Sequence, residues 1–360
     1  MKKFNKYVLK IYLLNLISVL ALILILYTFF QIIQHTKYLS KYNTSLFNIL
    51  VYDFLKIPYS IYQVFPVAGA TAVVITILKL IKNNELIAYL SLGGKIKDLV
   101  LLIVILNFIF TGILIYYSDV INPKIESIRK KFKEEKIYKE KYIKNFSLTD
   151  FYFKEKNFIY SIGLIAFDKK TFFDITIYKI KDNNIIKVVK ADKAIYKGNN
   201  VWIFYNYKSF DTSDIPKIEY SYKKLESLDN TLTQLINLPS DEPKRLTFKE
   251  LDKIIKTYES KGLNADKYKL IYYNKISVPL ILIVMIIFLI PLSIDISRNY
   301  QYIKIASKSL SFSMLFWILQ SICISLGKSG ILTPVLANFT SHIIFTFFGL
   351  YLITKKEKGL

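Results

Sequence analysis

The clearest pattern along the chain is a set of six long stretches that contain no Asp, Glu, Lys or Arg. They cover residues 11–33, 57–78, 99–118, 276–294, 309–327 and 329–354. Each is close to the roughly 20 residues that an α-helix needs to cross the hydrocarbon core of a bilayer. We therefore predict an α-helical membrane protein with six transmembrane helices.

The polar segment between Asp119 and Lys275 contains no charge-free stretch of comparable length. We therefore predict three spans, an inserted domain and three further spans. We place the first transmembrane half at residues 1–123, the insert at 124–265 and the second transmembrane half at 266–360. The first apolar stretch is full length and lacks a small-residue cleavage site, so we interpret it as a retained helix rather than a secretory signal.

The distribution of Lys and Arg at the span ends predicts the orientation. These residues gather at the N-terminus, in residues 79–98 and 295–308 and in the C-terminal tail, whereas the opposite short segments hold few. Cytoplasmic loops carry the excess of positive charge in membrane proteins. We expect both termini in the cytoplasm and the insert on the extracytoplasmic side.

The insert changes its hydrophobic period along its length. Residues 124–144 are densely charged with apolar side chains at helical spacing, which predicts a helix. From Phe151 to about Leu228 the period is two, as in residues 173–180 and 201–207, with turn signals at 182–184 and 198–200. Several short strands without helical crossovers indicate an antiparallel sandwich or jelly roll. Thr247 and Glu250 form a capping box for a short helix that ends near Gly262.

Composition limits the chemistry further. A net charge of +23 is compatible with nucleic-acid binding, but the basic residues of the insert are spread along it, so we expect a solvated surface and no nucleic acid. The single cysteine, Cys323, lies in a span, which excludes a disulfide framework.

No phosphate loop, metal-ligand spacing or catalytic set is present, so we expect no enzyme and no cofactor in this chain, and any ATP must be bound by another polypeptide. His342 lies within the sixth span. We interpret it as a neutral imidazole that is hydrogen-bonded to a neighbouring helix rather than as a functional residue.

The short amphipathic segment 82–94 lies between the second and third spans, on the predicted cytoplasmic side. Leu86, Tyr89 and Leu90 could form one face, with Glu85 exposed. Such a helix could be an interfacial anchor or could fit a groove of a cytoplasmic partner. Its spacing alone leaves both possibilities open.

Several motifs resemble those of the LptF/LptG (YjgP/YjgQ) lipopolysaccharide export permeases. They lie in order at residues 66–71, 78–93, 120–123, 246–251, 268–279 and 326–337, so that the resemblance covers essentially the whole chain. It implies a half-transporter that pairs with a sister permease subunit and a cytoplasmic ATPase dimer in the cell inner membrane. It further implies that the pair draws lipopolysaccharide from the outer leaflet and that the periplasmic domain passes it to a jelly-roll bridge protein.

The resemblance also implies roles for individual residues. The segment 82–94 is similar to the family's ATPase-coupling helix, which points to Glu85, Leu86, Ala88, Tyr89 and Gly93. Lys37, Lys41 and Arg129 follow the first and third spans, where cations would meet lipid phosphates, and the family similarly places basic residues there. The alternative for each is an ordinary flanking residue at the membrane interface.

Two other classes of function compete with lipid export. A membrane-anchored periplasmic assembly or signalling protein would keep the insert but would need no ATPase-docking helix. An intramembrane enzyme is a third possibility, which the missing catalytic set disfavours.

Overall fold

The chain forms two compact units in a computed structural model, one helical and one built around a sheet. The helical unit comprises Met1–Lys141 and Lys269–Leu360, and the sheet unit comprises Tyr142–Tyr268. The structure describes residues 2–139, 147–155, 157–166, 170–181, 184–198, 201–211, 217–227, 245–260, 262, 264–294 and 302–358. The unit boundaries place residues 124–141 with the membrane helices.

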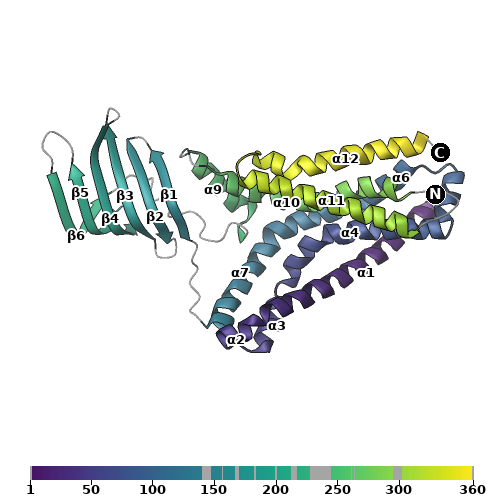
Figure 1. Cartoon of the computed structure of the whole chain (residues 1–360), viewed down its shortest axis with the longest axis horizontal. Helices are drawn as coiled ribbons and strands as arrows, with labels where there is room; N and C mark the ends of the chain where they lie inside the picture. Colours follow the sequence, from purple (N-terminus) through teal and green to yellow (C-terminus); the bar gives the residue numbers. More distant parts are fainter. Residues whose placement is uncertain are drawn as a thin grey trace. The chain divides into compact units, whose positions relative to one another are not determined.

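Six helices among the described residues are long and apolar enough to cross a membrane. They span Lys3–Tyr42, Ile57–Lys82, Ile96–Tyr138, Asp266–Ser293, Ile303–Lys328 and Pro334–Lys358. This result confirms the six predicted spans. Both termini lie at one end of the helical unit (Figure 1). We call the opposite end, which carries α2 (Lys37–Tyr42) and α3 (Leu46–Phe54), the distal end.

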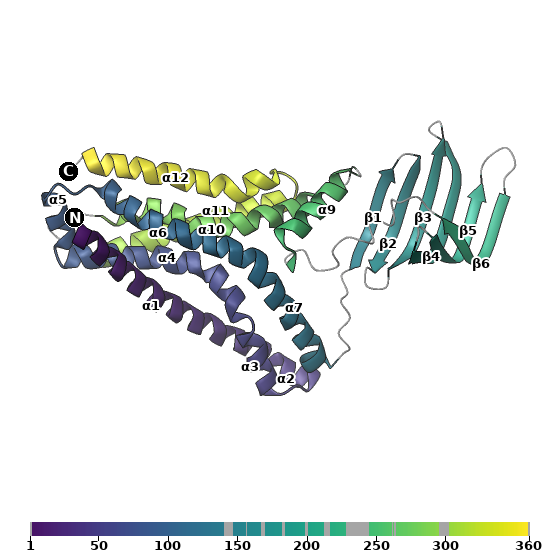
Figure 2. The same ribbon diagram turned by 180° about the vertical axis from the view of Figure 1, so that it is seen from behind.

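The core of the helical unit forms where small residues allow close helix packing. Helix α1 (Lys2–His35) packs along α4 (Ile57–Lys82), and both contact α6 (Ile96–Tyr116) in one apolar cluster (Figure 2). A Cβ atom at Gly69 of α4 would collide with Leu282 of α10 (Asp266–Ser293). A second cluster joins α10 to α11 (Tyr302–Lys328) and α12 (Pro334–Lys358). At Gly349, a Cβ would lie 2.9 Å from the Ile287 carbonyl oxygen.

The third span continues beyond the length that a membrane requires. Helix α6 runs through the π-helical turn η1 (Tyr117–Ile121) into α7 (Asn122–Phe132) and a second π-helical turn, η2 (Lys133–Tyr138). A π turn displaces the regular hydrogen-bond ladder, and Lys275 Nζ donates to the Ser118 carbonyl at 2.9 Å. The predicted helix at 124–144 is confirmed as far as Tyr138, and residues 140–146 lie outside the described residues.

The insert contains a six-stranded antiparallel sheet whose strands pair in sequence order, which makes it a meander. The strands are β1 (Ser147–Glu155), β2 (Phe158–Ala166), β3 (Thr171–Lys181), β4 (Asn184–Gly198), β5 (Val201–Asp211) and β6 (Lys217–Ser227). The predicted strands at 173–180 and 201–207 fall within β3 and β5. Of the predicted turns, residues 182, 183, 199 and 200 lie outside the described part of the chain, as does Leu228, the expected end of the strand region.

Aromatic side chains supply the core of the sheet unit. Phe172 of β3 stacks on Trp202 of β5 with ring centroids 4.8 Å apart, and Phe204 is also fully buried. After the sheet, α9 (Phe248–Ser260) begins with the predicted capping box. The Thr247 amide donates to Glu250 Oε2 at 2.8 Å, and the Glu250 amide donates to Thr247 Oγ1 at 3.3 Å. These bonds satisfy donors that a helix start leaves unpaired.

Candidate functional site

A cluster of aromatic and basic side chains occupies the distal end of the helical unit. We call it the distal cluster, and it comprises Tyr38, Tyr42, Tyr52, Arg129, Lys133 and Tyr138. Lys133 Nζ lies 5.4 Å from the Tyr38 ring centroid, 5.8 Å from that of Tyr52 and 4.9 Å from that of Tyr138. Tyrosine rings present a negative face to a cation within about 6 Å. The ammonium group is therefore held among three rings.

Arg129 is held in place by two neighbouring side chains. Its Nη1 donates to both carboxylate oxygens of Glu126, at 2.7 and 2.9 Å, and its Nη2 donates to the Tyr52 hydroxyl at 2.6 Å. The guanidinium carbon lies 4.4 Å from the Tyr52 ring centroid. Among the described residues, Arg129 Nε is buried without a hydrogen-bond partner. Burial raises the pKa of Tyr52, while Arg129 and Lys133 oppose that rise through their positive charges.

A buried carboxylate fixes α3 against the end of α1. His35 Nδ1 lies 2.6 Å from Asp53 Oδ1, and Asp53 is fully buried. Two further contacts tie the loop between α2 and α3 to η2 and to Lys139, the residue that follows it. Thr44 Oγ1 donates to the Lys136 carbonyl at 3.2 Å, and Lys139 Nζ donates to the Asn43 carbonyl at 2.9 Å. These contacts therefore hold in place the elements that carry the distal cluster.

The structure brings Lys37, Lys41 and Arg129 to the same end of the helical unit, but in different settings. Lys37 and Lys41 are exposed on α2, and their ammonium groups lie 5.9 and 5.3 Å from the rings of Tyr38 and Tyr42. Arg129 is largely enclosed, with 13% of its side chain exposed. Sequence reasoning missed Lys133, although it lies one helical turn after Arg129. The two α2 lysines are thus the more available cations.

The segment 82–94 forms the short helix α5 (Glu85–Ser91) at the end of the helical unit that carries the termini. Asn84 precedes it with φ at +59°, and Gly93 follows it with φ at +84°. Leu86 and Tyr89 are buried, and the Tyr89 ring stacks on Phe4 at 4.6 Å between centroids. A Cβ at Gly94 would collide with the Tyr89 ring. The apolar face of α5 is therefore used within the chain.

Glu85 is half-buried rather than exposed as expected. Its Oε1 accepts hydrogen bonds from the Tyr7 hydroxyl at 2.9 Å and from Asn83 Nδ2 at 3.2 Å, so α1 and the preceding loop hold it. The exposed face of α5 and its C-terminal turn comprises Ala88, Ser91, Leu92 and Gly93. Leu92 is 87% exposed. Of the five predicted coupling residues, Ala88 and Gly93 are open to a partner, while the other three anchor the helix.

Comparison with protein families identifies the chain. A model of the family described as lipopolysaccharide export system permease LptF/LptG matches residues 6–355. The chain belongs to this family. It is therefore a multi-pass membrane permease subunit of the lipopolysaccharide export system, and the family lacks an ATPase domain. No individual curated protein matches the sequence.

Membership of the LptF/LptG family decides between the functional classes that the sequence left open. A permease moves lipid, so transport takes precedence over a membrane-anchored assembly or signalling protein and over an intramembrane enzyme. Within the described residues, no group of three His, Cys, Asp or Glu side chains could hold a metal ion.

His342 belongs to a buried polar network between α10, α11 and α12. Its Nε2–H donates to the Ser277 carbonyl at 2.9 Å. Ser277 Oγ donates to Asn338 Oδ1 at 3.2 Å, and Gln320 Nε2 donates to the Asn338 carbonyl at 3.3 Å. Ser341 Oγ donates to Gln320 Oε1. In hydrocarbon, such interhelical bonds replace water and fix the helices relative to one another.

Proposed function

We propose that this permease is one half of an ATP-driven exporter in the cell inner membrane. It pairs with a sister permease, is powered by a cytoplasmic ATPase dimer and takes lipopolysaccharide from the outer leaflet of that membrane. The observation that carries the proposal is the distal cluster with Lys37 and Lys41 beside it, because it places several cations at one end of a membrane-spanning unit. Phosphate groups at headgroup depth need such cations.

The proposed orientation places the distal end at the periplasmic surface. It rests on the excess of Lys and Arg at the termini and at the loops on their side. Both termini and α5 then lie in the cytoplasm, where ATP is available. The sheet unit is periplasmic and delivers the lipid to a jelly-roll bridge protein.

Lys37 and Lys41 make the first contact with the lipid phosphates, because both are exposed. Arg129 acts as a second site. Its guanidinium must exchange Glu126 for a phosphate, and a phosphate oxygen can accept from Nη1 in place of the two carboxylate oxygens that now accept from it. Tyr52 would keep the group oriented during the exchange.

Helix α5 links this permease to the ATPase. Its buried residues, Leu86 and Tyr89, join it rigidly to the membrane helices, and its exposed residues, Ala88 and Gly93, face a partner. A short helix that is anchored on one side can carry a displacement of the ATPase into the span that follows it.

Replacing Lys37 and Lys41 together with Ala tests the proposal. Each cation near an anionic headgroup surface contributes about 1 kcal/mol, so we expect roughly 30-fold weaker lipopolysaccharide retention by the purified complex. ATPase co-purification should not change. The matched control is Lys3→Ala with Lys10→Ala, two exposed lysines at the opposite end of α1. Equal lipopolysaccharide retention by the two double variants would refute the headgroup role.

A further inference from the structure

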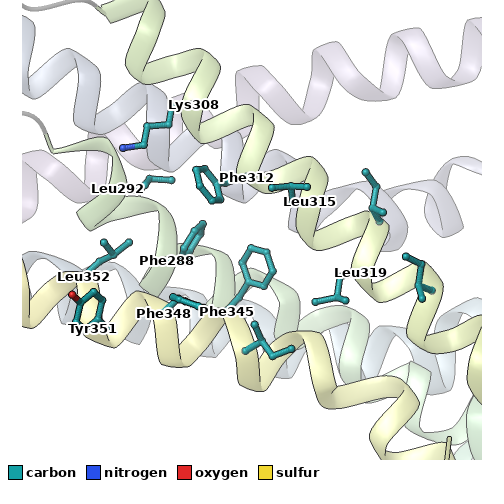
Figure 3. A pocket seen from close by; sticks show the side chains of 13 residues that line it. Phe288, Leu292, Lys308, Phe312, Leu315, Leu319, Phe345, Phe348, Tyr351 and Leu352 are labelled. Atoms are coloured by element: carbon teal, nitrogen blue, oxygen red, sulfur yellow. The ribbon is translucent and has the colours of Figure 1, made fainter.

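An apolar groove lies between α11 and α12, with α10 at its base (Figure 3). Its volume is about 630 Å³. Its lining is almost entirely aliphatic and aromatic, and includes Phe288, Phe312, Leu315, Leu319, Phe345 and Phe348. No part of the headgroup site or of α5 contributes to it. The groove therefore needs an explanation of its own.

One end of this groove is polar. Lys308 of α11 and Tyr351 of α12 lie on opposite sides of the groove at that end, and Leu319 lies toward the other (Figure 3). Lys308 is exposed and, among the described residues, takes part in no ion pair. Lys304 and Lys355 are also exposed, one helical turn from Lys308 and Tyr351 respectively, so that they extend the same basic edge. Tyrosine and lysine are the side chains that mark a membrane interface.

The groove is long enough to span one leaflet of a bilayer. Fourteen residues separate Lys308 from Ile322, the last residue of α11 that lines it, which corresponds to about 21 Å at 1.5 Å per residue. Half of the hydrocarbon core is about 15 Å thick. A ligand with its charged part at Lys308 would thus extend to the middle of the membrane.

The lining favours a flexible hydrocarbon chain. Four phenylalanine rings, those of Phe288, Phe312, Phe345 and Phe348, line the groove. A flexible hydrocarbon chain can enter the groove and contact the Phe rings along it.

We propose that this groove binds an anionic glycerophospholipid of the cytoplasmic leaflet, with one acyl chain among the Phe side chains and the phosphate at Lys308. The assignment to that leaflet rests on the orientation given under the proposed function. The lipid is distinct from the exported cargo, which enters at the distal end. Because three helices line the groove, the bound chain would stabilise the packing of α10, α11 and α12.

The test uses the complete permease complex in nanodiscs that contain phosphatidylglycerol and phosphatidylcholine. After extraction into detergent, native mass spectrometry measures how much phosphatidylglycerol remains on the permease. Lys308→Gln should lower the retained amount at least three-fold, and Leu315→Trp, which fills the groove, should abolish the selective retention. The matched controls are Lys10→Gln, another exposed lysine at the same end, and Leu22→Trp on the exposed side of α1.

A photocrosslinker at residue 315 provides a second measurement that does not depend on retention. It should label phosphatidylglycerol in preference to phosphatidylcholine. Labelling of a protein helix or of lipopolysaccharide would overturn the proposal, as would equal phosphatidylglycerol retention by Lys308→Gln and Lys10→Gln. A failure of the groove proposal can be distinguished from a failure of the proposed export function. The export function is tested separately in the same complex, by measuring lipopolysaccharide retention in the Lys37 and Lys41 double variant.

Discussion

Residues of the distal cluster hold two cations, Lys133 and Arg129, in different ways. Lys133 is surrounded by aromatic rings, which attract a cation but carry no charge of their own. Arg129 instead pairs with the Glu126 carboxylate, and its Nε is buried. The positive charge that a lipid phosphate can meet therefore lies on Lys133 rather than on the paired Arg129.

His342, in the sixth span, is a polar residue that contributes to helix packing rather than to ligand binding. His342 donates to a backbone carbonyl of α10 and lies among residues whose hydrogen bonds are satisfied by one another. Its ring also packs against Phe316 and Phe339, with centroids 5.5 and 5.7 Å away. This environment supports the expectation that the imidazole is structural.

We predict that His342→Gln retains lipopolysaccharide export, because the glutamine amide can also donate to the Ser277 carbonyl. The pH dependence of export between pH 6 and 8 should match that of the unmodified permease. His342→Leu, which cannot donate, should lower the thermal stability of the complex while leaving its remaining activity equally insensitive to pH. A change in the pH profile of the His342→Gln variant would show instead that the ring carries protons.

Among the elements, α5 shows how a helix of seven residues can be rigid. A helix this short is unstable by itself in water. Here its apolar side chains are buried, Tyr89 stacks on Phe4, and Glu85 is bonded to Tyr7 of α1. Gly94 permits the close approach of the chain to the Tyr89 ring. Tertiary contacts thus supply the stability that the local sequence lacks.

We predict that Glu85→Lys uncouples lipid export from ATP hydrolysis or releases the ATPase. The lysine cannot accept the Tyr7 and Asn83 hydrogen bonds, so α5 should lose its fixed position. ATPase co-purification and lipid-stimulated hydrolysis measure the effect. Unchanged values for both would exclude α5 as the coupling element.

A second substitution separates docking from anchoring. Leu92→Asp alters the exposed turn after α5 without touching its buried face. It should reduce ATPase co-purification while the thermal stability of the permease stays the same. Lys355→Asp, at an exposed position on α12, is the control. If both variants retained the ATPase equally, the partner would have to bind elsewhere.

At the scale of the whole molecule, the chain combines a membrane unit with a sheet in which β1 and β6 are the outer strands among the described residues. Within the part of the chain that the structure describes, β6 pairs with β5 alone and carries the exposed side chains of Ile218, Tyr220 and Tyr222. An exposed apolar edge is a site where another chain can add a strand. This feature fits the proposed transfer of lipid to a periplasmic bridge protein.

We predict that photocrosslinkers at Tyr220 and Tyr222 trap the bridge protein or lipopolysaccharide in cells. A crosslinker at Lys190, an exposed position on the interior strand β4, is the control, because Lys190 pairs with Thr176 of β3 and with Lys208 of β5. Crosslinks from β6 to bulk phospholipid alone would count against the handover role.

The sequence by itself determined the number of membrane spans and the family. Hydrophobic length defines a transmembrane helix almost independently of its neighbours, because the bilayer requires about 20 apolar residues wherever the helix packs. The strand pattern and the capping box were readable for a similar reason, since both depend on residues close in sequence. The cationic positions Lys37, Lys41 and Arg129 followed from their distance to the span ends.

Only the tertiary structure decided what those side chains contact. The pairing of Arg129 with Tyr52, and the cage around Lys133, join residues about 80 positions apart, which no local pattern specifies. The same holds for Glu85, whose partner Tyr7 lies on α1. The strand order of the sheet and the groove beside Lys308 likewise depend on which elements pack together. Local periodicity sets what an element is, whereas burial and pairing between distant segments set which of its residues remain free to bind.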